Sequence, residues 1–309
     1  MSHHPGFGPE DAEAAFSFLG DGLRLSILRS LADHARDAGP AAEAMAYSDL
    51  RRAVDEEDSG KFSYHLGKLT GRFVEQVPGG YRLREPGREA IRLLERGAVS
   101  GDASLSPTTL DRECPLCGAS VRVVYGDHHL YTTCTDCAGL FGEGCPEGTL
   151  TGIAVPPATV GGREPDELFV RAHRLFERRL WSMFDGLCVE CGGDVHRRLD
   201  RCDSHEHPND GVCPACNAGY PALASLVCDT CGRGRVSHPL FGRTDAPRLH
   251  DLLAAAGTDD AWERFAVALS WEPIDREDGA VAFRPPDGVR VGDDRAATPI
   301  VDPDLTLRW

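Results

Sequence analysis

The apolar positions of the first hundred residues recur at helical spacing in short segments that are separated by turns. The pattern predicts helices over 11–19, 22–34 and 47–54, with Asp21 and Ser48 as the caps of the second and the third. The stretch between the second and third segments is small and polar, so we expect a loop there. Short helices in this order indicate a small, mainly helical domain.

The longest helical pattern covers residues 58–76, DSGKFSYHLGKLTGRFVEQ. At about 100° per residue, its apolar side chains share one face and its cationic and hydrogen-bonding side chains share the other. The apolar face consists of Phe62, Leu66, Leu69 and Phe73, and the polar face consists of Lys61, Tyr64, His65, Lys68 and Arg72. Asp58 or Ser59 is the expected cap. Such a face suits a helix that enters the DNA major groove, and an ordinary solvated surface helix is the alternative.

A hairpin and a last helix complete the predicted domain. Gly79-Gly80 is a hairpin turn signal, and residues 81–83 alternate as a strand does. Pro86 then opens a helix that is predicted over 87–96. The order of helices, hairpin and helix predicts a winged helix-turn-helix domain over residues 9–97. In that domain, segment 58–76 is the recognition helix and the hairpin is the wing.

The segments LGDGLRLSILRSL, SDLRRAV and GKFSYHLGKLTGRFVEQVPGGYRL resemble the ArsR-type winged-helix repressors of bacteria and archaea. The resemblance implies a transcriptional regulator that binds double-stranded DNA as a homodimer. The residues it points to for DNA contact are Lys61, Ser63, Tyr64, His65, Lys68 and Arg72 on the recognition helix, and Arg82 and Arg84 on the wing. Metal-sensing members carry cysteines on the preceding helix, and this domain has none. We therefore expect no arsenic or cadmium sensing there.

Ten of the 12 cysteines form five C-x-x-C pairs. This spacing is typical of thiolate–metal sites, and without a secretion signal a disulfide framework is the weaker interpretation. After a linker predicted over 98–111, a first zinc ribbon is expected over 112–160, with strands over 120–125 and 129–133. Its predicted ligands are Cys114, Cys117, Cys134 and Cys137, a closed set that is typical of a structural zinc site. We expect Cys145 to be a small buried residue or a bystander thiol.

A connecting helix is predicted over 164–186, and a second zinc ribbon over 187–241. The cysteine order leaves two pairings open. The nested scheme repeats the order of the first ribbon and joins Cys188/Cys191 to Cys228/Cys231. It leaves an inserted site whose four candidate ligands are Cys202, His205, Cys213 and Cys216. In that site, His207 could replace His205. The other scheme joins Cys188/Cys191 to Cys213/Cys216 and leaves Cys228/Cys231 for Cys202 and a histidine. We expect Zn²⁺ at two sites and treat the third as a candidate.

The last segment, 242–309, carries no motif with chemical meaning. Its pattern predicts helices over 247–256 and 260–270, and short strands over 280–284, 289–291 and 305–309. The expected fold class is therefore a multidomain α+β protein. A winged helix-turn-helix is followed by two zinc-ribbon-like modules, which a helix joins, and by a small α+β tail.

The net charge of −16 is distributed unevenly. Residues 1–98 hold 13 Lys and Arg against 16 Asp and Glu, a net of −3, and the other 211 residues hold 20 against 33, a net of −13. Both lysines of the chain, Lys61 and Lys68, lie in the predicted recognition helix. An acidic surface with scarce lysine resembles proteins of salt-loving archaea, in which acidity is a solubility adaptation, although a GC-rich genome alone would also favour Arg over Lys.

No apolar run approaches the ~18 residues of a membrane span, and the first residues lack the pattern of a signal peptide, so we expect a cytoplasmic protein. No P-loop, H-E-x-x-H or G-x-S-x-G motif is present, so we expect no enzymatic activity. The expected function is a DNA-binding transcriptional regulator with structural zinc. Two alternatives remain. In one, a protein partner binds the zinc-ribbon region and the winged helix is structural; in the other, the cysteines at 188–231 form a thiol or metal sensor.

Overall fold

The computed structural model describes residues 17, 19–39, 44–98, 103–206, 212–255, 257–286 and 298–309. The chain divides into two compact units, Met1–Asp102 and Ala103–Trp309. Helices and several small antiparallel sheets confirm the predicted α+β class. Within the described residues, no helix is both long and apolar enough to cross a membrane. The helix predicted over 11–19 lies almost wholly outside the described residues.

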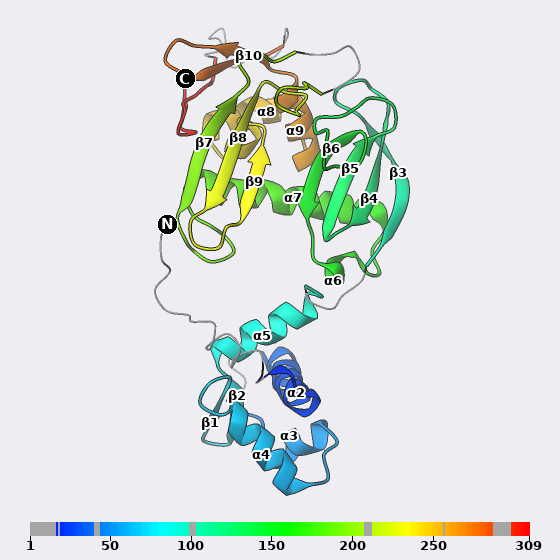
Figure 1. The fold of residues 1–309 in the computed structure, drawn as a ribbon, viewed down its shortest axis with the longest axis vertical. Coiled ribbons are helices and arrows are strands. Elements are labelled where there is room, and N and C mark those ends of the chain that lie inside the picture. Colours follow the sequence, from blue (N-terminus) through cyan, green and yellow to red (C-terminus); the bar gives the residue numbers. More distant parts are fainter. Residues whose placement is uncertain are drawn as a thin grey trace. The chain divides into compact units, whose positions relative to one another are not determined.

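The N-terminal unit consists of helices packed together with a short hairpin (Figure 1). Its elements are α2 (Gly22–Ala38), α3 (Tyr47–Ala53), α4 (Ser59–Leu69), β1 (Val74–Val77), β2 (Gly80–Leu83) and α5 (Glu85–Glu95). One apolar cluster joins them, and its members include Ile27, Leu28, Leu31, Leu50, Phe62, Leu66, Leu69, Phe73 and Ile91. The predicted apolar face of segment 58–76 is therefore the face that packs in this core.

Helix α4 is shorter than the predicted helix 58–76. Asp58 caps it, because its carboxylate accepts from the N–H groups of Gly60 at 2.8 Å and Lys61 at 3.1 Å. The helix ends at Leu69, and Gly71 turns the chain with a φ of 90° before strand β1 begins. Residues that carry a side chain rarely adopt a positive φ, whereas glycine does so without strain. The prediction that Arg72 and residues up to 76 are helical was wrong.

Two other local predictions met different outcomes. Asp21 caps α2, because its Oδ1 accepts from the Arg24 N–H at 3.0 Å. Ser48 does not cap α3: the cap residue is Ala46, which has no side-chain acceptor, and Ser48 lies inside the helix.

The hairpin pairs β1 with β2 as predicted. At Gly80 a Cβ atom would lie 2.1 Å from the Met45 carbonyl oxygen, so glycine lets the segment before α3 pair with the hairpin.

The described part of the C-terminal unit contains three antiparallel sheets and several helices (Figure 1). The first sheet has the order β3 (Leu105–Glu113), β4 (Ser120–Gly126), β5 (His129–Cys134) and β6 (Thr149–Ala154). The second has the order β7 (Val195–Arg201), β8 (Ala222–Cys228) and β9 (Gly234–Ser237). The third has the order β10 (Glu272–Asp275), β11 (Val281–Arg284), β12 (Ile300–Val301) and β13 (Leu307–Arg308). The helices are α6 (Pro157–Val160), α7 (Pro165–Phe184), η1 (Phe241–Arg243), α8 (Pro247–Ala255) and α9 (Ala261–Leu269).

Helix α7 lies against both ribbon-like sheets and against α9 (Figure 1). It has a buried apolar stripe, whose members are each at most 7% exposed: Phe169, Ala172, Phe176, Leu180, Met183 and Phe184. One continuous apolar cluster includes this stripe together with residues of both sheets and of the tail. The segments predicted as separate modules over 112–309 therefore share a single core.

Two predictions for this unit need correction or fall outside the structure. The predicted linker 98–111 was wrong from residue 105 onward, because strand β3 begins there and pairs with β4 through two register shifts. Leu110 in that strand is 4% exposed and packs in the core, so pairing with β4 and one buried side chain fix a segment that is rich in Ser, Thr and Pro. The strand predicted over 289–291 lies outside the described residues.

Candidate functional site

Twelve side chains of the C-terminal unit gather into three groups of four, each of which can hold a metal ion. Within each group the ligand atoms all lie within 4.8 Å of one another. The first cluster is Cys114, Cys117, Cys134 and Cys137; the second is Cys188, Cys191, Cys228 and Cys231; the third is Cys202, His205, Cys213 and Cys216. All twelve predicted metal ligands are thus brought together in these clusters.

The first cluster has the dimensions of a tetrahedral thiolate site. Four sulfurs at ~2.3 Å from one zinc ion would lie ~3.8 Å from each other. Cys114 Sγ lies 3.8 Å from Cys137 Sγ, and Cys117 Sγ lies 3.4 Å from Cys134 Sγ. Strands β4 and β5 position the two pairs, because Val121 stands opposite Cys134 in their antiparallel register.

The second cluster follows the nested pairing. Cys188 Sγ lies 3.7 Å from Cys231 Sγ, and Cys191 Sγ lies 3.5 Å from Cys228 Sγ. Strands β7 and β8 set this arrangement, since Val195, which follows the first pair, stands opposite Cys228. The order of strand and cysteine pair is therefore the same as in the first cluster. The competing scheme, which joins Cys188 and Cys191 to the pair at 213 and 216, is not the one the structure contains.

The third cluster lies in the insertion between β7 and β8. Cys216 Sγ lies 3.4 Å from His205 Nδ1, and Cys202 and Cys213 supply the other two sulfurs. Cys213 is buried, whereas Cys202 and His205 are partly exposed and Cys216 is exposed. His207, the predicted substitute for His205, lies outside the described residues.

Four of the five C-x-x-C pairs form the same tight turn, which we call a knuckle. The residue after the second cysteine has a positive φ, and its N–H donates to the carbonyl oxygen of the first cysteine at 2.8 to 3.0 Å. These residues are Gly118, Gly192, Asn217 and Gly232. Glycine and asparagine adopt this backbone most readily. The pattern C-x-x-C-[GN] was therefore visible in the sequence as a further signal for these turns.

Backbone N–H groups favour the ionised form of selected thiols. Burial opposes ionisation of the Cys134 thiol, but the N–H groups of Asp136 and Cys137 donate to its Sγ and lower its pKa to about 7. The pKa of the Cys228 thiol is also lowered to about 7. The N–H of Cys231 is the main cause, and it outweighs the opposing effect of burial. Burial instead raises the pKa of Cys114 and of Cys137, the latter to about 11. Since metal binding requires thiolates, the backbone donors favour metal binding at Cys134 and Cys228, whereas burial opposes ionisation of the other two thiols.

The knuckle of the third cluster is also hydrogen-bonded to the segment between β5 and β6 of the first sheet. Asn217 accepts through Oδ1 from the Glu143 N–H at 2.8 Å, and its Nδ2 donates to the Glu143 carbonyl at 3.0 Å. The Gly142 N–H donates to the Asn217 carbonyl, and the Gly219 N–H donates to that of Leu140. A metal ion in this cluster would therefore fix a contact between segments 140–143 and 217–219.

In the N-terminal unit, the exposed face of α4 carries part of the predicted DNA contact set. Tyr64 is 62% exposed, and Lys68 Nζ lies 5.4 Å from the centre of its ring. Lys61 is exposed and its Nζ lies 2.7 Å from Glu56 Oε2. Ser63 is exposed, and its hydroxyl lies 2.7 Å from that of Tyr47. Lys61, Tyr64 and Lys68 are three and four residues apart, so they share one side of the helix.

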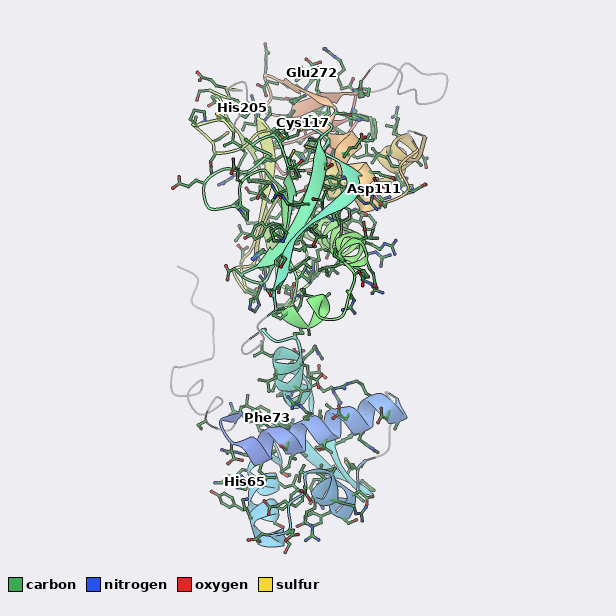
Figure 2. The ribbon with its side chains drawn as sticks, turned by 90° about the vertical axis from the view of Figure 1, so that its right-hand side faces the viewer. His65, Phe73, Asp111, Cys117, His205 and Glu272 are labelled. Carbon is green, nitrogen blue, oxygen red and sulfur yellow. The ribbon has the colours of Figure 1, made fainter. Side chains whose placement is uncertain are left out.

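The other predicted DNA contacts serve the fold or lie off the helix. His65, on α4 (Figure 2), is 15% exposed, and its Nδ1 lies 3.2 Å from Oδ1 of Asp21, the cap of α2. The Arg84 guanidinium donates to the Gly71 carbonyl and so holds the turn after α4. Arg82 lies 2.7 Å from Glu75 across the hairpin. Arg72 is exposed, but it follows the end of α4.

Gly67 is a residue on this face that the sequence patterns did not single out. It lies inside α4, where glycine costs about 1 kcal/mol relative to alanine. Its φ is not positive, and a Cβ atom there would meet nothing within 4 Å. The fold of the N-terminal unit therefore makes no demand for glycine at this position. A neighbouring molecule that approaches the backbone closely would make that demand.

The fold and the clusters define a mixed α+β protein with three candidate metal centres. The chain belongs to the family described as domain of unknown function DUF7351, which matches residues 111–306. Residues 12–94 match a second family, described as domain of unknown function DUF7347. The two matches fall one in each compact unit. No curated protein matches the chain.

Proposed function

We propose that this chain is a DNA-binding transcriptional regulator whose N-terminal unit is a winged helix-turn-helix domain that resembles the ArsR type. Helices α3 and α4 would form the helix-turn-helix, and the β1–β2 hairpin would form the wing. The observation that carries the proposal is the exposed face of α4. It holds both lysines of the chain, an exposed tyrosine and a glycine for which the fold has no need. A homodimer on double-stranded DNA is part of the proposal.

The contacts of the described residues suggest separate roles on this face. Lys68 and Lys61 would bind phosphates or guanine edges, with Lys61 exchanging Glu56 for the DNA. Tyr64 and Ser63 would contact bases or sugars. Gly67 would let the helix backbone approach the groove. His65 is reassigned from base contact to the support of α4, because it is largely covered and faces Asp21.

We also propose that the three clusters hold zinc. Thiolate and imidazole are its preferred ligands, and the sulfur distances of the first two clusters agree with a tetrahedral ion. Four protein ligands leave no position for water, so the ions would be structural. Metal analysis of the purified chain tests this: three firmly held zinc ions support the proposal. Labile metal with reversible thiol oxidation would favour a sensor instead.

The DNA proposal is tested by neutralising Lys61, Lys68 and Arg72 together. Duplexes are first selected from a random pool with the parent protein, and affinity is then measured by fluorescence anisotropy over a series of salt concentrations. The parent should bind with a steep salt dependence, and each lost phosphate contact should reduce the slope of log K against log salt by about 0.9. Binding by the triple variant should be abolished.

A matched control removes three charges from the other unit, by substituting alanine for Arg171, Arg174 and Arg178 on the exposed side of α7. This variant should bind DNA as the parent does. If the α4 variant binds the selected duplex as well as the parent, the assignment of α4 as the recognition helix is wrong.

A protein-interaction module is the second candidate. Around the second cluster, Leu187 is 53% exposed and Val189 and Val227 are each 45% exposed. Exposed apolar side chains at this density suit a protein partner. If no duplex is selected and a partner co-purifies with the parent but not with a Val227→Asp variant, this candidate replaces the first.

A further inference from the structure

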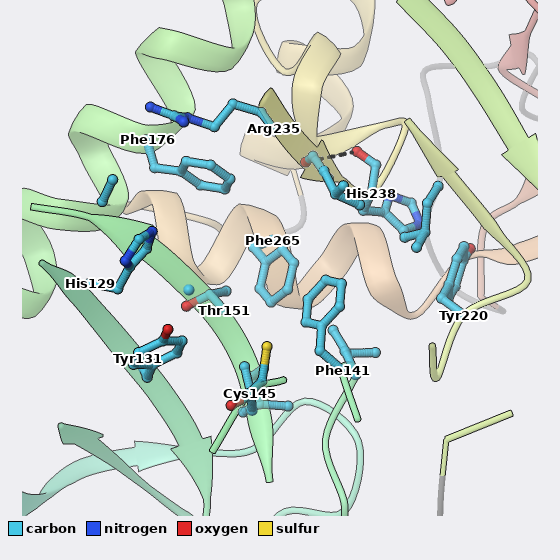
Figure 3. A pocket seen from close by; sticks show the side chains of 18 of the residues that line it. His129, Tyr131, Phe141, Cys145, Thr151, Phe176, Tyr220, Arg235, His238 and Phe265 are labelled. Carbon is cyan, nitrogen blue, oxygen red and sulfur yellow. Dashed lines mark hydrogen bonds between the residues drawn. The ribbon is translucent and has the colours of Figure 1, made fainter. Parts of the chain in front are cut away.

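The C-terminal unit contains a cavity of about 310 Å³ between its two ribbon-like sheets. Strands β6 and β9 are the edge strands of those sheets, and both line the cavity together with α7 and α9. The aromatic rings around it include Phe141, Phe176 and Phe265 (Figure 3). Small-molecule sites in proteins begin at about this volume and are lined mainly by apolar side chains.

One wall of the cavity carries a buried donor that lacks a partner. His238 lines the cavity and is 3% exposed. Its Nδ1 accepts from the Leu240 N–H at 3.2 Å, so the proton of the neutral ring is on Nε2. Nε2 is buried, and no group of the described residues forms a hydrogen bond with it. Buried polar groups in native proteins are nearly always paired, so Nε2 is free to donate to an acceptor from outside the described residues.

The ring of His238 is held in place rather than free to turn away. It packs edge-on against Tyr220, with 4.5 Å between ring centres, and against Phe283, with 5.4 Å. The Tyr220 hydroxyl is already used, because it donates to the Trp271 carbonyl at 2.9 Å. Burial lowers the pKa of His238 to about 3, so the imidazole is neutral at ordinary pH. It offers one hydrogen bond and no charge.

The charge of the lining restricts the ligand further. Of the described residues that line the cavity, none is Asp or Glu, and Arg235 is the permanently charged one. The Arg235 guanidinium donates to the Gly234 carbonyl and points toward α7 (Figure 3). A cationic ligand would therefore find no carboxylate here, whereas a neutral aromatic group would contact the phenylalanine rings.

The cavity also has a route to solvent. Cys145, Gly234 and Val236 line it and are exposed, and His129 and Tyr131 are partly exposed. These residues form a rim around the entrance. Leu140 and Phe141 in the wall belong to the segment that is hydrogen-bonded to the knuckle of the third metal cluster. The wall is thus attached to both ribbon-like halves.

We propose that this cavity binds a small, uncharged aromatic molecule that carries one hydrogen-bond acceptor, and that His238 Nε2 donates to that acceptor. The rings of Phe141, Phe176 and Phe265 would surround the aromatic group. This site does not depend on the DNA-binding proposal, and it remains if α4 binds no DNA. In a regulator, such a ligand would be the signal.

The test uses the full chain loaded with metal and two probes of similar shape. Acetophenone carries a carbonyl acceptor, and isopropylbenzene does not. Binding is measured by saturation-transfer NMR with titration. The parent should bind both probes and should prefer acetophenone by on the order of tenfold, because the hydrocarbon leaves Nε2 unpaired. His238→Phe should remove the preference while it keeps the aromatic contacts.

Two further variants block the space, and a third is their control. Ala154→Leu, on β6, fills the cavity, and Cys145→Phe does so from the exposed rim, where a larger side chain does not disturb the core. Ala254→Leu makes the same change as the first at an exposed position of α8. Both blocking variants should bind either probe at least about tenfold more weakly, which is about 1.4 kcal/mol. The control should bind as the parent does.

Two outcomes would overturn the inference. The first is that the folded, metal-loaded parent protein gives no saturation transfer to either probe at millimolar concentration. The cavity would then be a water-filled gap between the sheets. The other is binding that Cys145→Phe does not weaken, which would place the probes elsewhere.

Discussion

Replacing Glu177 by alanine should destabilise the C-terminal unit more than any exposed charge change on the same helix. Glu177 lies in the middle of α7 and is 1% exposed. Arg264 of α9 donates to both of its carboxylate oxygens, from Nε and Nη2, each at 2.6 Å. The Thr244 hydroxyl donates to Oε1 at 2.8 Å and accepts from Trp181 Nε1 at 2.8 Å. One carboxylate therefore joins α7 to α9 and to the segment after η1.

The magnitude follows from what remains after the change. Removing one partner of a buried ion pair leaves the other charge covered and unpaired, which costs about 3–5 kcal/mol. Here Arg264 is 16% exposed and would lose both of these hydrogen bonds. For a unit of this size, 1 kcal/mol lowers Tm by about 2–4 °C, so the expected decrease is about 6–20 °C.

Tryptophan fluorescence is the suitable assay, because all four tryptophans, Trp181, Trp262, Trp271 and Trp309, belong to the C-terminal unit. The signal therefore reports the unfolding of that unit alone. The matched control is Glu167→Ala, which removes the exposed pair with Arg171 on the same helix. Exposed pairs contribute about 0–1 kcal/mol, and this small effect should decrease at high salt while the Glu177 effect persists.

A double variant separates the loss of the pair from the cost of an unpaired charge. Glu177→Leu together with Arg264→Met removes both charges and should recover most of the stability, since apolar replacement of a buried pair is often nearly neutral. If Glu177→Ala costs no more than Glu167→Ala, the assignment of a tightly coupled buried network is refuted.

Three further predictions concern pH, metal and the hairpin. Burial lowers the pKa of His173 to about 4, so the stability that the neutral ring contributes is complete above pH ~6.5 and is lost as pH falls. Between pH 7 and 5, the unfolding free energy should fall by about 2 kcal/mol more in the parent than in His173→Gln. Denaturant titration measures this difference. His205→Ala should lower zinc content from three ions to two in metal analysis, and full retention would remove His205 from the ligands. Gly80→Ala should destabilise the N-terminal unit by about 1–3 kcal/mol in hydrogen exchange, because its Cβ would overlap the Met45 carbonyl.

The cysteine spacing was informative because a C-x-x-C pair fixes its own turn. Each pair needs only five residues to form a knuckle, and the strands between the pairs follow from local alternation. The prediction of β4 and β5 rested on such local signals, and both strands are present. The joining of Cys188/Cys191 to Cys228/Cys231 was one of two open schemes, because it depends on which distant segments meet.

The predictions that failed depended on contacts that a local pattern does not contain. Apolar spacing placed Phe73 on the recognition helix, and Phe73 is indeed buried, but it reaches the core after the turn at Gly71. Strand β3 was mistaken for linker because the segment has the composition of a linker, and its pairing with β4 is a contact that composition does not show. Helical spacing alone placed His65 on the polar face, and it could not show that Asp21, the cap residue of α2, lies beside it.

The cavity was also beyond sequence analysis, for the same physical reason. Its walls come from β5, β6, α7, β9 and α9, which are distant in the chain. His238 stands in no recognisable motif, and only its burial without a partner for Nε2 makes it a candidate. Sequence therefore predicted which cysteines could gather around a metal ion, because their spacing is local. It did not reveal the cavity, because long-range packing creates it.

The central claim, that α4 enters a DNA groove, is tested most directly by adding one methyl group at Gly67. Gly67→Ala should stabilise the N-terminal unit by about 1 kcal/mol, because alanine is the better helix former and the added Cβ meets nothing within 4 Å. The same variant should bind the selected duplex about tenfold more weakly, a loss of about 1.4 kcal/mol. Gly22→Ala, in which the Cβ is equally unobstructed, should leave DNA affinity unchanged. If Gly67→Ala binds the duplex as tightly as the parent, the exposed face of α4 does not approach DNA, and the account of this helix is wrong.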